Sequence, residues 1–83
     1  MIIKLRDTLV KRARSSSSHY RDIQEGLCTA PVKIGEKSVG WPIDEIKILN
    51  AARIAGLNKQ EIKNLVVDLH LKRKAILAKM MEG

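Results

Sequence analysis

The stretch from Lys4 to Arg21 carries the side chains whose types and spacing are best suited to chemistry. It holds six cations and one anion, and four consecutive serines occupy positions 15 to 18. Hydroxyl and guanidinium groups bind phosphate oxygens, and an arginine can also donate two hydrogen bonds to guanine O6 and N7. This stretch therefore indicates a surface for a polyanion.

Side chains that usually carry catalysis are sparse. The chain has two histidines, His19 and His70, far apart in the sequence, and a single cysteine, Cys28. No carboxylates cluster, and neither a glycine-rich phosphate loop nor zinc-ligand spacing occurs. An active site needs convergent polar groups in a cleft. We therefore predict that the protein is not an enzyme and uses no metal or cofactor.

The composition is that of one small globular domain. The chain has 83 residues, of which 45 % are hydrophobic and 30 % charged. Phe is absent, and Trp and Tyr occur once each, so the core must be mainly aliphatic. The formal charge of +7 favours a polyanionic partner, either nucleic acid or an anionic membrane surface.

Several features point to a reducing, aqueous compartment. A lone Cys28 cannot form an intramolecular disulfide, and no run of about 18 apolar residues is present to span a bilayer. The start, Met1 to Lys4, is too short and too soon charged for a signal peptide. We expect a cytoplasmic protein with no membrane partner.

Hydrophobic spacing predicts two short helices at the start of the chain. Leu5 to Ala13 has apolar residues at helical spacing, and the helix should stop near Arg14. Either Ser15 or Ser16 could cap a second helix over about residues 16–25, which Gly26 would end. A flexible linker is the alternative interpretation of the serine run, but the run is short and lies between two amphipathic segments.

The pattern then changes to a β-hairpin. Val32–Ile34 and Val39–Trp41 alternate apolar with polar or small residues around a four-residue loop, Gly35–Ser38. Pro31 and Pro42 bracket the hairpin and disfavour a central strand, which predicts a two-stranded ribbon rather than a larger sheet. Such a ribbon needs a helix to lie on, and Trp41 is the largest apolar group available for that contact.

Two more helices are predicted in the second half. One runs from Ile43 to Ala55 and ends at Gly56, and Asn58 with Glu61 has the spacing of a capping box that starts the other. The last helix carries an apolar stripe that is interrupted by Lys72–Lys74. The part before the interruption should pack on the domain, and the part after it should project. The first part is Ile62, Leu65, Val66 and Leu69, and the second part is Ile76, Leu77 and Met80.

This order of elements is that of a winged helix-turn-helix. The predicted fold is mainly α with a small β-hairpin: a single domain over 1–83, with a core and wing over 1–57 and a C-terminal amphipathic helix over 58–83. In such a domain the second helix enters the major groove of DNA through its N-terminal residues, while the first helix and the hairpin reach the backbone.

Three stretches resemble the AlpA family of prophage regulators, within the MerR-like and excisionase-like winged-helix group. They are Ser15–Leu27, Pro31–Gly35 and Ser38–Pro42, the last followed by Glu45-Ile46. The resemblance covers about residues 3 to 73. It implies a small transcription regulator from a prophage or integrative element that binds double-stranded DNA, some of whose relatives direct an integrase toward excision.

The resemblance places the start of the recognition helix at Ser16, Ser17 and Ser18, with Arg21 one turn on. We expect Ser17 and Arg21 at base edges, and phosphate contacts from Ser16, Lys11, Arg12 and Lys37. The full set of predicted DNA-binding residues is Lys11, Arg12, Arg14, Ser16, Ser17, Ser18, Arg21, Lys33 and Lys37. The alternatives are that Ser16 only caps its helix and that Lys11 and Arg12 form an ordinary solvated face.

Four other residues have predicted roles. Tyr20 should pack against the first helix more readily than on DNA, and His19 should be a partly packed side chain or a phosphate donor. Cys28 stands where the family commonly has Phe and should be a small buried hydrophobe. Lys37 stands where Arg is usual in the family, so its phosphate contact would be a point charge rather than a bidentate pair.

Two alternative functions remain. The first is an excisionase, a recombination directionality factor that acts with an integrase at repeated sites. The second is a protein-interaction module whose docking surface lies on the last helix, at Ile76, Leu77, Met80 and Met81. A short helix-to-helix contact in a homodimer is compatible with the same stripe.

Overall fold

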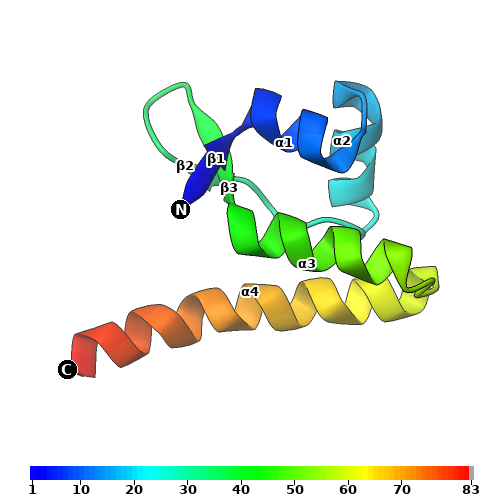
Figure 1. Cartoon of the computed structure of the whole chain (residues 1–83). Helices are drawn as coiled ribbons and strands as arrows, with labels where there is room; N and C mark the ends of the chain where they lie inside the picture. The colour runs from blue at the N-terminus through cyan, green and yellow to red at the C-terminus, as the bar shows by residue number, and fades with distance from the viewer. Residues whose placement is uncertain (83) are drawn as a thin grey trace.

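The computed structural model describes residues 1–82 and is mainly helical, with a small antiparallel sheet. Helix α3 lies between α4 and a layer formed by the sheet, α1 and α2, and the second half of α4 extends beyond that layer (Figure 1). In chain order the elements are β1 (Ile2–Lys4), α1 (Leu5–Arg12), α2 (Ser16–Gln24), β2 (Val32–Lys33), β3 (Val39–Pro42), α3 (Ile43–Ile54) and α4 (Lys59–Glu82).

The sheet has three strands in the order β1-β3-β2, so the prediction of a two-stranded ribbon is wrong. The predicted hairpin is present as β2 and β3, although β2 ends at Lys33. The additional strand is β1, whose Ile3 pairs with Trp41. Pro42 is tolerated in the central strand because it is the last residue of β3, where the backbone turns into α3.

Gly40 permits the close pairing of β1 with β3. A Cβ atom at Gly40 would lie 2.6 Å from the carbonyl oxygen of Ile3 and 2.7 Å from Cγ2 of Ile2. No carbon approaches a backbone oxygen that closely without displacement, so any side chain here would push β1 away. The third strand therefore depends on a glycine within the hairpin.

A tight turn joins α1 to α2. Ala13 adopts a left-handed conformation with φ 54°, and the amide of Arg14 donates to the carbonyl of Leu9 at 3.1 Å. Ser15 caps α2, because its hydroxyl oxygen accepts from the amide of Ser18 at 3.2 Å. Gly26 ends that helix at φ 78°, as predicted. The serine run is thus a helix start and not a linker.

Helix α1 packs inward through the face that carries Leu5, Thr8, Leu9 and Arg12. Its buried residues are Thr8 and Arg12, whereas Val10 is exposed. The hydroxyl of Thr8 donates to the carbonyl of Lys4 at 3.0 Å, which satisfies it inside the protein. Arg12 is buried because it has an ionic partner on α2, described below. Hydrophobic spacing therefore identifies Leu5 and Leu9 on this face, but not the two polar residues that are buried between them and beyond.

The predicted capping box starts α4. The amide of Glu61 donates to Oδ1 of Asn58 at 2.9 Å, and the amide of Asn58 donates to Oε1 of Glu61 at 3.1 Å. Before it, α3 ends with Gly56 at φ 83°. The four-residue connection over 55–58 brings α4 back along α3, and the two helices lie side by side (Figure 1).

The core is small and aliphatic apart from Trp41. One cluster of buried residues joins α3 and α4, and another joins the sheet to α3; Ile23 of α2 packs against both. The first cluster is Cys28, Leu49, Val66 and Leu69. The second is Ile3, Trp41 and Ile46. The predicted stripe on α4 is confirmed in its first half.

Polar contacts fix α4 to the loop before β2. Arg73 donates from Nη2 to the carbonyl of Ala30 at 2.8 Å and makes a bidentate pair with Glu45. The amide of Ala30 donates to Nε2 of His70 at 3.0 Å. After Arg73 the helix leaves the domain, and Ile76, Leu77 and Met80 are exposed. Within residues 1–82, no helix is both long and apolar enough to cross a membrane.

We predict that Gly40→Ala lowers the free energy of unfolding by about 2 kcal/mol, because the added methyl group overpacks against the backbone of β1. Urea unfolding monitored by Trp41 fluorescence measures the change. Gly35→Ala is the matched control, since the nearest atom to its Cβ would be 3.8 Å away, in ordinary contact. Equal stability of the two variants would contradict the role given to Gly40.

Candidate nucleic-acid interface

A buried ionic network, which we call the Asp22 network, fixes α2 against α1 and the turn. It consists of Asp22, Arg12, Arg14 and His19. Arg12 donates from Nη2 to Oδ2 of Asp22 at 3.0 Å, and Arg14 donates from Nη2 to Oδ1 at 2.7 Å. A third bond runs from Nε of Arg14 to Oδ2 at 2.9 Å. The carboxylate is buried and receives three charge-assisted bonds.

His19 is the fourth member and is fully buried. Its Nδ1 lies 2.8 Å from Nη1 of Arg12, and because an arginine can only donate, Nδ1 accepts and the proton is on Nε2. The ring packs edge-on against Trp41, with centroids 4.6 Å apart. His19 is therefore a packed side chain and does not face solvent, where a phosphate donor would have to lie.

The pKa values of His19, Asp22 and Arg14 are shifted by their surroundings in the network. Desolvation, together with the charge of Arg12, lowers the pKa of His19 to about 4, so the ring is neutral near neutral pH. Burial alone would raise the pKa of Asp22, but hydrogen bonds from Arg14 and Arg12 lower it. The hydrogen bond with Asp22 raises the pKa of Arg14.

Two of the predicted DNA-binding arginines are engaged inside this network. The side chain of Arg12 is 2 % exposed and that of Arg14 is 33 % exposed, and both are paired with Asp22. Arg12 thus has a structural role, and no phosphate can reach its paired end groups without breaking the network. Arg14 keeps part of its surface open beside the start of α2.

The outer face of α2 presents the residues expected to read bases. Ser16, Ser17 and Arg21 are exposed, and Tyr20 beside them is 38 % exposed rather than packed away. Within residues 1–82, Arg21 makes no side-chain hydrogen bond or ion pair that would hold it on the protein. Ser18 is half-buried, with its hydroxyl oxygen accepting from that of Ser15 at 3.1 Å.

The β2–β3 hairpin brings a second basic group close to α1. Lys37 and Ser38 at the hairpin tip line a hollow of about 210 Å³ together with Lys4 and Arg6. Lys33 is also exposed on this hairpin. Lys4 and Arg6 were absent from the predicted site, although they belong to the same basic stretch of sequence. Three cations around one hollow suit a phosphate oxygen.

The remaining predicted residues have simple positions. Lys11 is exposed at the end of α1, and its carbonyl accepts from Nδ2 of Asn50 at 2.9 Å, which ties α1 to α3. Cys28 is buried in the core as predicted, and burial raises the pKa of its thiol. Within the described residues, no three His, Cys, Asp or Glu side chains lie close enough to hold a metal ion.

Comparisons with models of known protein families, with curated proteins and with solved structures gave no match for this chain.

Breaking the Asp22 network should destabilise the fold. We predict that Asp22→Asn lowers the free energy of unfolding by about 3 kcal/mol, because it leaves the buried guanidinium of Arg12 without a counter-charge. Asp68→Asn, an exposed acid on α4 with no ion pair in the described chain, should change it by less than about 0.5 kcal/mol. Urea unfolding of both variants makes the comparison, and a similar small loss in both would contradict the network's role.

Acidification should destabilise the protein through His19. In the unfolded chain His19 takes up a proton near its ordinary pKa of 6.5, whereas the folded protein resists protonation until about pH 4. The unfolded state therefore binds more protons in this window, and stability falls by roughly 3 kcal/mol as the pH drops through it. Unfolding free energies measured across the window test this, and His19→Gln should flatten the profile. If the pH profile of that variant is unchanged, the pH dependence arises from groups other than His19.

Proposed function

We propose that this protein is a sequence-specific DNA-binding transcription regulator of a prophage or integrative element, built as a winged helix-turn-helix. In this proposal α2 is the recognition helix in the major groove and the β2–β3 hairpin is the wing on the phosphate backbone. The cell compartment would be the bacterial cytoplasm, at the nucleoid. The sequence resemblance to the AlpA family supports the same function.

The observation that carries the proposal is the division of α2 into two faces. Asp22 and Ile23 hold the inner face against α1 and the core, so that side chains of the first turns on the outer face are free. Those free side chains are hydroxyls and one guanidinium, at Ser16, Ser17 and Arg21. An arginine without an internal partner, one turn from a helix start, suits a guanine edge.

Charge at the hairpin supports the backbone contact. Lys37 of the tip lies beside Lys4 and Arg6, so two segments of the chain contribute cations to one place. A phosphate contact there would strengthen binding to any sequence, while α2 would supply the discrimination. In this proposal the hairpin contributes mainly affinity, and α2 contributes sequence specificity.

An excisionase would use the same domain and differ in the sites it occupies. A regulator requires a promoter site, whereas a recombination directionality factor requires several adjacent sites near an attachment region. The exposed Ile76, Leu77, Met80 and Met81 on α4 favour a protein-interaction module as a second candidate. An integrase would be the expected protein partner of an excisionase.

Gel-shift binding tests the proposal, with fragments tiled across the protein's genomic neighbourhood, excess nonspecific competitor and a salt series. We expect a specific fragment to be retained, and Arg21→Ala to weaken its binding by about 10- to 100-fold while nonspecific binding changes little. Lys37→Ala should weaken the binding of all fragments alike. It should also reduce the salt dependence of binding by the contribution of about one phosphate contact.

Lys47→Ala is the matched control, because Lys47 is an exposed cation on α3 outside the proposed interface. Specific retention of a single promoter fragment supports the regulator. Cooperative binding at several adjacent sites near an attachment region supports the excisionase. Failure of every fragment to outcompete nonspecific DNA would overturn both and favour the protein-interaction module.

A further inference from the structure

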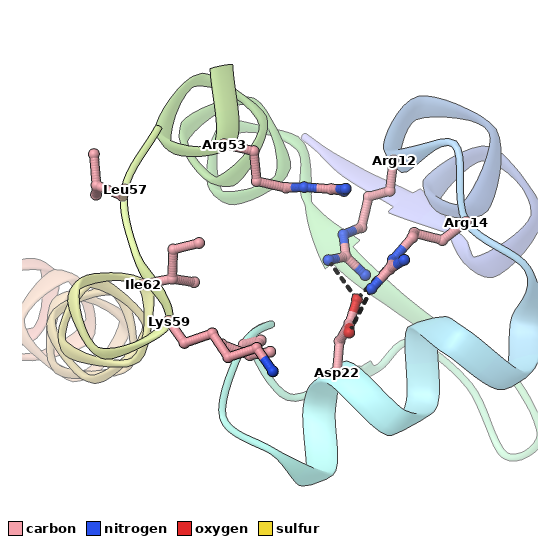
Figure 2. Close-up of a pocket in the computed structure, with 8 residues that line it drawn as sticks. Arg12, Arg14, Asp22, Arg53, Leu57, Lys59 and Ile62 are labelled. Carbon is pink, nitrogen blue, oxygen red and sulfur yellow. Dashed lines mark hydrogen bonds and ion pairs between the residues drawn. The ribbon is translucent and has the colours of Figure 1, made fainter. Parts of the chain in front are cut away.

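A small basic pocket lies on the opposite side of the Asp22 network from the outer face of α2. It forms where the turn after α1, the inner face of α2, the end of α3 and the start of α4 meet (Figure 2). Its volume is about 110 Å³. The lining residues are Arg12, Arg14, Asp22, Leu27, Arg53, Leu57, Lys59 and Ile62.

The pocket has an excess of positive charge. Four of its lining side chains are basic and one is acidic. The carboxylate of Asp22 is already shared by Arg12 and Arg14, while Arg53 and Lys59 have no ion pair within residues 1–82. Figure 2 shows Arg53 extending toward Arg12, and the ammonium end of Lys59 extending toward α2. Converging like charges repel one another, so a bound anion would stabilise this arrangement.

Arg12 supplies a second, independent observation. It is 4 % exposed, and its buried Nε–H has no hydrogen-bond partner, although its other donors reach Asp22 and His19. An unpaired buried donor is unusual in a folded protein and costs free energy. Arg12, which lines the pocket, therefore carries one buried donor that the protein itself does not satisfy.

The opposite wall is apolar. Leu27, Leu57 and Ile62 line it, and Figure 2 places Leu57 and Ile62 on the side away from Arg12 and Arg14. An apolar wall reduces the water around the cations and so strengthens their attraction for an anion. The volume suits one tetrahedral oxyanion with several oxygen acceptors.

We propose that this pocket is a binding site for a phosphate group, as inorganic phosphate or a small phosphate ester. Arg53 and Lys59 would be its direct ligands, and Arg14 would contribute the surface that it leaves open. This site is separate from the proposed DNA interface and does not depend on it. Because Arg12, Arg14 and Asp22 also fix the angle between α1 and α2, occupancy of the pocket would stabilise that angle.

Titration of the protein with inorganic phosphate, without DNA and at constant ionic strength, tests the proposal. Isothermal titration calorimetry measures binding, and the thermal unfolding midpoint is followed by Trp41 fluorescence. We expect saturable binding and a rise in the midpoint of about 10 to 20 °C at about one hundred times the Kd. Arg53→Gln and Lys59→Gln should each weaken binding by at least about tenfold.

Lys47→Gln is the control, because it removes an exposed cation of α3 that does not line the pocket, and it should bind phosphate like the unaltered protein. A rise that does not saturate and is equal in Arg53→Gln would reflect exclusion of phosphate from the surface, and the site would not exist. No phosphate binding together with weaker DNA binding by Arg53→Gln would place these cations at the DNA backbone and overturn the proposal. The phosphate titration contains no DNA, so saturable phosphate binding can be found or excluded whether or not the proposed DNA function is correct.

Discussion

The buried carboxylate of Asp22 determines how the first two helices pack against each other. A charge removed from water must be compensated, and here Arg12 from α1 and Arg14 from the turn both supply hydrogen bonds to it. These bonds fix which face of α2 turns inward. The outer face, with Arg21, is exposed as a consequence. A small aliphatic core alone would define this orientation less strictly, because apolar packing is not directional.

The second half of the chain acts as a support for this pair of helices. Trp41 of the central strand packs against His19, and its indole N–H donates to the carbonyl of Thr29 at 2.8 Å. Helix α4 then holds the loop that contains Thr29 through Arg73, which also neutralises the buried Glu45. Charged and hydrogen-bonded groups thus connect the small core to every neighbouring element, which suits a domain that is close to the lower size limit for independent folding.

The sequence predicted most of the helices, because local signals determine them. The Ser15 cap, the Gly26 end of α2 and the Asn58–Glu61 capping box act over a few residues, and the structure confirms each of them. The strand β1 could not be predicted in the same way, since three residues carry too little pattern and its pairing depends on Gly40, far along the chain.

The candidate site was predicted less completely, for a related reason. Arg12 and Arg21 are the same residue type in one basic stretch, and only tertiary pairing with Asp22 buries one and leaves the other free. Arg53 and Lys59 gave no signal, because folding alone brings them to the turn after α1. Lys4 and Arg6 belonged to the basic stretch, but their place beside Lys37 required the third strand and the hairpin.

We propose that the outer face of α2 and the β2–β3 hairpin contact DNA, and amide NMR of the isotope-labelled protein can test both contacts in one experiment. A short DNA duplex of any sequence, titrated at low salt, suffices, because nonspecific complexes are held mainly by phosphate contacts. Amide shifts should change at Ser16, Ser17 and Arg21 and around Lys37, while the second half of α4 should be unaffected. Changes confined to α4, or no changes at all, would contradict this proposal.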